Sequence, residues 1–147
     1  MKIAMVSSHG GHLTELRMLA EAFDRHDLFY VTYESERTKH LDIDAYTLEN
    51  IGTSPLSMAT ALGKIIRWFW TQQPDVVVST GSEIAIPAFL AGEFLGATTI
   101  FVESWCRVTN RSATGRLVYP LVDHLFVQWP ELLDEYGEKA EFQGSVL

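Results

Sequence analysis

The chain has 147 residues, of which 47% are hydrophobic and 20% are charged, and 11 Lys and Arg against 19 Asp and Glu give a net charge of −8. This length and composition fit one globular domain and exclude a disordered, collagen-like or disulfide-stabilised chain. The acidic balance argues against a general nucleic-acid binder, and the single cysteine, Cys106, cannot form an internal disulfide.

Apolar runs and helical patterns alternate along the whole chain. In the first half we expect, in chain order, a strand at Ile3–Ser7, a helix at Thr14–Phe23, a strand at Leu28–Tyr33, a charged surface connection with room for one helical turn at Glu34–Asp44, a strand at Tyr46–Ile51 and a helix at Pro55–Gln73. In the second half we expect a strand at Asp75–Thr80, a helix at Glu83–Leu95, a strand at Thr98–Glu103 and a helix at Ala113–Leu121. A strand at His124–Gln128, a helix at Glu131–Tyr136 and a short strand at Ala140–Gln143 should follow. This alternation predicts an α/β fold, a doubly wound parallel sheet of Rossmann-like type with helices on both faces.

Ligands of such sheets bind beyond the carboxyl ends of the strands. That rule directs attention to three strand ends, at residues 8–12, 80–83 and 103–107. In the first helix, Leu16 and Leu19 belong to the apolar face, and Glu15 is expected on the opposite, polar face.

The first strand end carries Gly10, Gly11 and His12 directly before a helix. Two glycines allow a ligand to approach the backbone closely, and a helix start favours an anion. His12 is a candidate general base or phosphate donor because imidazole titrates near neutral pH. The alternative is a tight turn in which His12 caps the helix. The pattern is neither a Gly-x-Gly-x-x-Gly fingerprint nor a P-loop.

Small polar residues around Gly81 follow the strand at Asp75–Thr80, and a turn of this kind alone is ordinary. Two such turns on neighbouring strands, however, indicate a crevice.

Glu103 ends an otherwise apolar strand, where a carboxylate is costly unless it is paired or used. Arg107, Arg111 and Arg116 follow it and form a local basic cluster that suits a phosphate-bearing ligand. The alternative is a solvated face on which Glu103 pairs with one of these arginines.

The expected helix at Pro55–Gln73 is amphipathic and carries two cations, Lys64 and Arg67, with Trp68 and Trp70 at its flanks. It either packs against the sheet or lies at a bilayer surface, where tryptophan and basic residues are favoured. No window approaches the roughly 18 consecutive apolar residues of a spanning helix. His26, His40 and His124 lack ligand spacing, so we expect no metal site.

Several motifs occur together in one known family. They are Gly-Gly-His-x-Thr-Glu at Gly10–Glu15, Ser-Thr-Gly at Ser79–Gly81, Val-Glu-Ser-x-Cys-Arg-Val at Val102–Val108, Ser-x-Thr-Gly-Arg-Leu at Ser112–Leu117 and Phe-Val-Gln-Trp-Pro at Phe126–Pro130. From Lys2 to Val146 the chain resembles the acceptor-side, membrane-recruiting subunits of the two-subunit UDP-N-acetylglucosamine transferase of the dolichol pathway. It is also similar to bacterial subunits that work in pairs as polysaccharide glycosyltransferases, and to the N-terminal domain of the lipid II-forming transferase of peptidoglycan synthesis.

The resemblance implies that residues 1–147 form the acceptor-binding half of a GT-B glycosyltransferase, while a partner subunit holds the UDP-sugar. Transfer, of GlcNAc by analogy, would go to a polyprenyl-pyrophosphate-linked sugar with inversion and without metal or cofactor. His12 and Glu103 would be catalytic. The acceptor and its phosphates would be bound by Gly10, Gly11, Thr14, Gly81, Arg107 and Ser112. The C-terminal strand and residues 144–147 would join the partner.

One departure concerns membrane attachment. Eukaryotic members carry an N-terminal membrane helix, whereas here Met1 leads directly into the first expected strand. We therefore expect a peripheral protein on the cytoplasmic face of the cell membrane, with Lys64, Arg67, Trp68 and Trp70 as its candidate membrane surface. The acceptor lipid is either dolichyl- or undecaprenyl-linked. The alternatives are a non-catalytic scaffold that recruits the donor-binding subunit to the membrane, and an unrelated small nucleotide binder.

Overall fold

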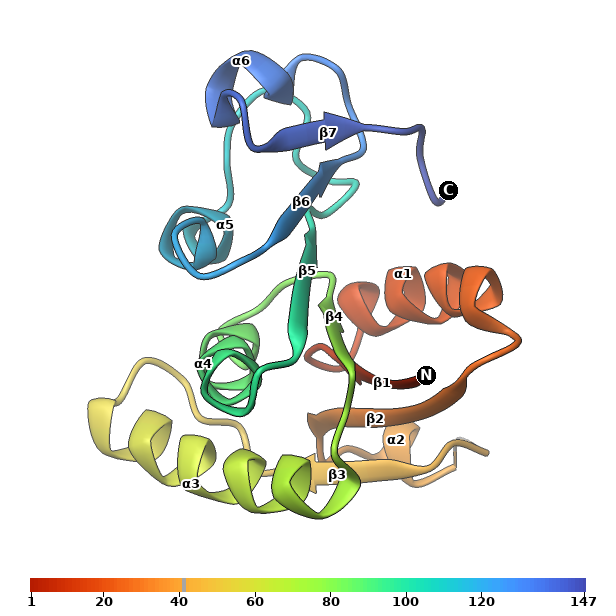
Figure 1. Ribbon diagram of the computed structural model, residues 1–147, viewed down its shortest axis with the longest axis vertical. Coiled ribbons are helices and arrows are strands. Elements are labelled where there is room, and N and C mark those ends of the chain that lie inside the picture. The colour runs from red at the N-terminus through yellow and green to blue at the C-terminus, as the bar shows by residue number, and fades with distance from the viewer. Residues whose placement is uncertain (41) are drawn as a thin grey trace.

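The computed structural model describes residues 1–40 and 42–147, and its strands form one seven-stranded sheet in the order β3-β2-β1-β4-β5-β6-β7 (Figure 1). The strands are β1 (Lys2–Val6), β2 (Asp27–Tyr33), β3 (Ala45–Leu48), β4 (Val76–Ser79), β5 (Thr98–Val102), β6 (His124–Val127) and β7 (Ala140–Phe142). All neighbouring strands pair in parallel, which confirms the predicted doubly wound α/β sheet.

Helices cover both faces of this sheet. They are α1 (Gly11–Ala20), a short 3₁₀ turn η1 (Glu21–Phe23), α2 (Glu36–Lys39), α3 (Pro55–Gln72), α4 (Ala85–Leu95), α5 (Ala113–Val118) and α6 (Leu132–Tyr136). Figure 1 shows α1 on one face and α3, α4 and α5 on the other. The core is divided accordingly. One cluster lies under α1 and includes Ile3, Met5 and Leu16, and a larger one lies on the other face around Phe69 and Phe89.

The element boundaries lie within a few residues of the expected ones, and the differences have local causes. α1 begins at Gly11 instead of Thr14 because Gly10, with φ 90°, turns the chain directly into the helix. The strand expected to reach Ile51 ends at Leu48. In the expected connection 34–44, Ser35 caps the single turn of α2, and residue 41 of that connection lies outside the described residues.

The order of the strands determines where a ligand can bind. The chain proceeds from β1 outward to β2 and β3, then returns to the other side of β1 and continues outward from β4 to β7. The segments that follow β1 and β4 therefore lead into helices on opposite faces, α1 and α4 (Figure 1). A crevice forms at such a reversal, beyond the carboxyl ends of the two strands.

α4 packs very closely on the sheet at Gly92. A Cβ atom added there would lie 2.9 Å from Cγ2 of Val77 and 3.4 Å from Cγ2 of Thr99, two fully buried side chains. Gly63, in the middle of α3, has no atom within 4 Å of the corresponding position. The two glycines thus sit in the same kind of secondary structure but in opposite packing environments.

This contrast predicts opposite effects of one substitution. Gly63→Ala should raise the free energy of unfolding by up to about 1 kcal/mol, because alanine is the better helix former. Gly92→Ala should lower it, because overpacking a rigid core costs about 1–3 kcal/mol and exceeds that gain. Urea unfolding of both variants checks this. Equal stabilisation by both would mean that Val77 and Thr99 move aside at no cost.

Candidate functional site

A cavity of about 440 Å³ lies at the carboxyl ends of β1, β4 and β5. Residues from three segments line it: Gly11, His12 and Glu15 of α1, Gly81, Ser82 and Glu83 after β4, and Ser104, Cys106, Arg107, Ser112, Ala113 and Thr114 after β5. Its size falls in the range of about 300–1,000 Å³ that is usual for small-molecule sites. The three strand ends singled out from the sequence thus come together in one polar cleft.

His12 is half-buried in this cleft and has a defined orientation. Its Nδ1 lies 2.9 Å from the carbonyl oxygen of Thr80, and the hydroxyl of Thr80 donates to the carbonyl of His12 at 2.7 Å. Because a carbonyl oxygen only accepts, Nδ1 carries the proton in this contact and Nε2 keeps its lone pair. His12 can therefore act as a base through Nε2.

The ring of His12 rests on Gly81. A Cβ atom at Gly81 would lie 3.0 Å from Cε1 of His12, and the φ of 122° at Gly81 is one that favours glycine. The alternative in which His12 caps α1 is wrong, because Gly10 occupies the N-cap position and no side chain caps the helix.

Glu103 lies beneath the cleft and is 1% exposed. Its carboxylate accepts hydrogen bonds from the N–H of Ser104 at 2.9 Å, from the N–H and hydroxyl of Ser112 at 3.0 and 2.9 Å, and from the hydroxyl of Tyr136. These neutral donors satisfy the buried charge, and in the described part of the chain no arginine pairs with Glu103. The alternative of a Glu103–arginine pair on a solvated face is therefore wrong.

Glu15 was expected on the polar face of its helix, and that prediction is wrong, because it is only 6% exposed. The segment after β5 covers it: the hydroxyl of Ser104 donates to Oε1 at 3.0 Å, and the N–H of Trp105 donates to Oε2 at 3.3 Å. The side-chain amide of Gln128 also donates to Oε2, at 3.3 Å. Glu15 is thus a second buried carboxylate in the wall of the cleft.

Gln128 connects this wall to the C-terminal segment. Its amide nitrogen also donates to the carbonyl of Glu103 at 3.0 Å, while its amide oxygen accepts from the hydroxyl of Ser145 at 3.1 Å and the N–H of Val146 at 3.0 Å. Glu15, Gln128 and Tyr136 were not among the predicted site residues. For Gln128 a signal was available, since it follows an apolar strand as a polar residue in the same way as Glu103.

The three arginines expected to form one basic cluster have different environments. Arg107 lines the cleft. The guanidinium of Arg111 lies over the ring of Tyr136, 5.6 Å from its centre, and Arg116 is exposed on α5. Among the other predicted residues, Gly11, Gly81 and Ser112 line the cleft.

Gly10 and Thr14 lie at its edge and do not line it. The hydroxyl of Thr14 donates to the carbonyl of Gly10 at 3.2 Å, which closes the start of α1 on itself. Their proposed contact with phosphate therefore depends on backbone groups at this helix start.

Glu83 lines the cleft beside His12 and is half-exposed. The hydroxyl of Tyr33 donates to Oε1 at 2.9 Å and that of Ser82 to Oε2 at 2.6 Å. Burial alone would raise the pKa of Glu83, but the hydrogen bonds from Ser82, its own N–H and Tyr33, and the nearby His12, hold it below its ordinary value. Burial, followed by the bond to Glu83 and its charge, raises the pKa of Tyr33.

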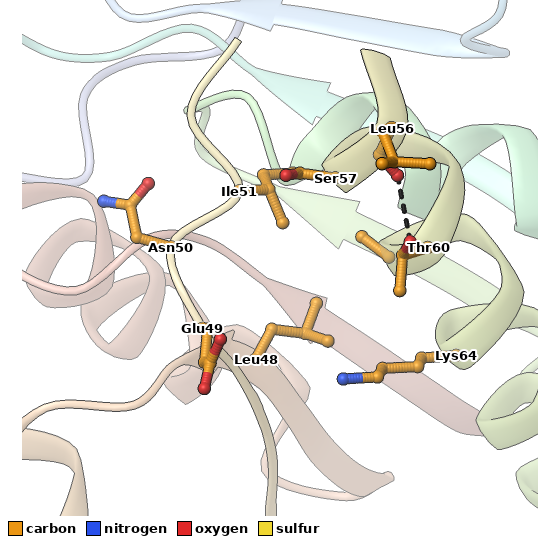
Figure 2. Close-up of a pocket in the computed structure, with 9 residues that line it drawn as sticks. Leu48, Glu49, Asn50, Ile51, Leu56, Ser57, Thr60 and Lys64 are labelled. Carbon is orange, nitrogen blue, oxygen red and sulfur yellow. Dashed lines mark hydrogen bonds between the residues drawn. The ribbon is translucent and has the colours of Figure 1, made fainter. Parts of the chain in front are cut away.

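The candidate membrane residues lie on α3. Trp68 is half-buried and stacks on Tyr46 with ring centres 5.0 Å apart, whereas Trp70 is 66% exposed. Figure 2 shows Lys64 reaching from α3 across a separate cavity of about 230 Å³, toward Leu48 and Glu49. Within residues 1–40 and 42–147, no helix is long and apolar enough to cross a bilayer.

The described residues also contain no group of three or more His, Cys, Asp or Glu side chains placed to hold a metal ion. The charged or titratable side chains that line the cleft are those of His12, Glu15, Glu83, Cys106 and Arg107.

The Tyr136–Glu103 contact predicts that the free energy of unfolding decreases at alkaline pH. Burial, followed by the hydrogen bond to Glu103 and its charge, raises the pKa of Tyr136 above the ordinary 10.0. Above that pH the unfolded chain loses the phenolic proton while the folded chain keeps it, so the free energy of unfolding falls as pH rises. Tyr136→Phe lacks this phenolic proton, so its free energy of unfolding should fall less steeply with pH, by up to about 1.4 kcal/mol per pH unit.

Denaturant unfolding between pH 8 and 11 measures the decline. Tyr30 and Tyr33 also have raised pKa values, so it should persist in part in Tyr136→Phe. An equally steep decline in Tyr136→Phe and the unmodified protein would contradict the assignment to Tyr136.

Comparison with solved structures identifies the fold. MurG of Acinetobacter baumannii superposes with a TM-score of 0.82 at 15% identity, over 99% of this chain and 46% of that one. The UDP-GlcNAc 2-epimerase of Methanocaldococcus jannaschii gives a TM-score of 0.76 at 19% identity, over 99% of this chain and 46% of that one. The fold is therefore that of the N-terminal half of GT-B proteins, as predicted.

The relatives found by sequence comparison that are described here share one protein name. UDP-N-acetylglucosamine transferase subunit alg14 of Schizosaccharomyces pombe is 37% identical over 92 residues, 58% of this chain and 43% of the relative. The subunit ALG14 of Homo sapiens is 31% identical over 81 residues, 51% of this chain and 37% of the relative. That of Yarrowia lipolytica is 25% identical over 99% of this chain and 81% of its own length.

The chain thus spans less than half the length of the S. pombe and human relatives that it matches. The family model "Oligosaccharide biosynthesis protein Alg14 like" matches residues 45–146, which include the strand ends after β4 and β5, the second and third segments of the cleft. The chain belongs to the Alg14 family.

Proposed function

We propose that this chain is the acceptor-binding subunit of a heteromeric glycosyltransferase. A partner subunit would hold a UDP-sugar, with GlcNAc inferred from the names of the relatives, and the acceptor would be a sugar linked to a polyprenyl pyrophosphate. The observation that carries the proposal is the cleft itself, which combines His12, with its free Nε2, and Arg107 in a chain of the Alg14 family. A base and a cation in one cleft suit a hydroxyl nucleophile on a phosphate-bearing acceptor.

The proposed reaction is a single displacement. A hydroxyl oxygen of the acceptor sugar bonds to the anomeric carbon of the donor sugar on the face opposite UDP. The bond from that carbon to the phosphate oxygen breaks, UDP leaves with the electron pair, and the hydroxyl proton passes to Nε2 of His12. The configuration at the anomeric carbon inverts. The contact of Nδ1 with Thr80 holds the imidazole in the tautomer that this step requires.

The remaining predicted residues support acceptor binding. Gly10 and Gly11 bring the acceptor phosphates to the first N–H groups of α1, a ten-residue helix, and Arg107 provides the counter-charge. Glu103 does not reach the cleft surface, so its role is positional: it fixes Ser104 and Ser112, which do.

The partner would dock at the C-terminal segment. Residues 143–146, together with Leu19, Phe23, Ile100 and Phe126, line a mainly apolar cavity of about 390 Å³ on the α1 face of the sheet. Residues of α1, η1, the sheet and this segment border the cavity, and an apolar surface of this kind is typical of contact sites. This location would bring the donor-binding subunit next to the cleft, because Gln128 lines the apolar cavity and contacts Glu15 of the cleft wall.

Activity should require both the partner and His12. The purified chain alone should transfer no sugar, and the complex with its donor-binding subunit should transfer sugar from a UDP-sugar to a polyprenyl-pyrophosphate-linked acceptor. His12→Ala should assemble normally and lose about 10²–10⁴-fold in kcat, the usual contribution of a general base. His40→Ala, at an exposed histidine after α2, is the matched control and should retain full activity.

Transfer by the isolated chain would refute the proposal. A fully active His12→Ala complex would instead favour the alternative of a non-catalytic scaffold that recruits the catalytic subunit to the membrane.

We further propose that α3 contacts the membrane surface through Trp70, Lys64 and Arg67. Trp70 is exposed and both cations are on the solvent side of the helix. The aromatic ring suits the bilayer interface, and the cations suit anionic headgroups. Trp68, by contrast, packs against Tyr46 and the core, so its loss would disturb the fold as well.

Trp70→Ser should weaken binding to vesicles of phosphatidylcholine and phosphatidylglycerol about ten- to hundredfold, because burial of a large apolar side chain contributes about 1.5–3 kcal/mol. Phe142→Ser, at an exposed aromatic residue of β7 near the opposite edge of the sheet, should leave vesicle binding unchanged. Sedimentation with vesicles measures both. Equal binding by Trp70→Ser and the unmodified protein would leave α3 as an ordinary packing helix.

A further inference from the structure

Glu83 is a carboxylate in the cleft that the proposed displacement does not use. It lies in the turn between β4 and α4 and lines the cavity near His12. Tyr33 at the end of β2 and Ser82 each donate to a different oxygen of Glu83, so the carboxylate is held in one position. Each oxygen retains capacity for a further donor, because a carboxylate oxygen accepts about two hydrogen bonds.

The charge of Glu83 is maintained at neutral pH. Its pKa lies below the ordinary value despite partial burial, and the raised pKa of Tyr33 keeps the phenol protonated as a donor. The other charged or titratable groups that line the cavity are His12, Glu15, Cys106 and Arg107. Of these, Glu15 already accepts three hydrogen bonds from the chain. Glu83 is therefore the carboxylate with most capacity for a ligand.

The cleft thus carries two chemically different charged groups. Arg107 comes from the segment after β5, and Glu83 comes from the segment after β4. A carboxylate repels phosphate but accepts hydrogen bonds from hydroxyl groups, whereas a guanidinium binds phosphate. A ligand with a pyrophosphate and sugar hydroxyls can therefore bind each group with the part that suits it.

We propose that Glu83 binds hydroxyl groups of the acceptor sugar, so that the sugar lies beside Glu83 and the ring of His12, and the pyrophosphate lies beside Arg107. This inference rests on the proposed acceptor, and it adds the direction in which that acceptor lies. The nucleophilic hydroxyl is thereby brought to the side of the cleft that carries Nε2 of His12. Glu83 would select for a sugar beside it and against a second phosphate group.

Two ligands distinguish the two charged groups: a short-chain polyprenyl pyrophosphate, and the same molecule carrying one GlcNAc on its terminal phosphate. Their affinities for the complex of the chain with its partner would be measured by calorimetry at constant ionic strength. Glu83→Gln should weaken binding of the sugar-bearing ligand about ten- to hundredfold, as expected for loss of hydrogen bonds to a charged acceptor. It should leave the affinity for the sugar-free ligand unchanged or tighten it.

Arg107→Gln should weaken binding of both ligands. Glu93→Gln is the matched control, since it removes the same charge from an exposed position of α4 and should change neither affinity. Tyr33→Phe removes one of the two hydrogen bonds that hold Glu83 and should weaken only the sugar-bearing ligand, by a smaller factor. This variant keeps the carboxylate and tests the same assignment if Glu83→Gln folds poorly.

The outcomes separate the inference from the proposed function. If the unmodified complex binds both ligands and Glu83→Gln binds the sugar-bearing one equally well, the inference is overturned and the proposed acceptor stands. If Glu83→Gln weakens both ligands equally, the direction of the acceptor is wrong. If the unmodified complex binds neither ligand, the proposed acceptor fails, and the role of Glu83 fails with it.

Discussion

The buried carboxylate of Glu103 is the group on which the arrangement of the cleft depends. It directly follows β5 at a position with almost no access to water, so its charge is compatible with the fold only if the chain itself supplies donors. Those donors come from Ser104 and Ser112 in the segment between β5 and α5, and from Tyr136 at the end of α6. Satisfying one charge therefore fixes the course of the chain after β5, and with it the position of Arg107 in the cleft.

The same carboxylate limits what can surround it. A Cβ atom at Gly115 would lie 2.7 Å from Oε2 of Glu103 and would also collide with the hydroxyl of Tyr136. The first turn of α5 can approach Glu103 only because residue 115 has no side chain. On the other side of the cleft, Gly81 has the corresponding relation to the ring of His12. Close approach of backbone to a functional side chain is thus the common feature of both walls.

Much of the fold and part of the cleft could be predicted from the sequence. The strands were recognisable because a parallel sheet buried on both faces requires continuous apolar runs, and their carboxyl ends located His12, Gly81 and Glu103. Glu15 was misplaced because helical periodicity describes one helix against one sheet, and here the segment after β5 covers the polar side as well. The separation of Arg111 from Arg107 could not be predicted from the sequence either, since it depends on the ring of Tyr136.

The hydrogen bonds of Gln128 have a consequence for how this protein acquires its site. Gln128 and Glu15 are 113 positions apart in the chain, and Trp105 and Glu15 are 90 apart. Closing such long loops costs conformational entropy that only a largely assembled sheet can offset. We therefore expect the cleft wall to form late in folding, after β1, β4, β5 and β6 are in register. Because Gln128 contacts both the C-terminal segment and the buried Glu15, the integrity of the cleft depends on these four strands and on the end of the chain together.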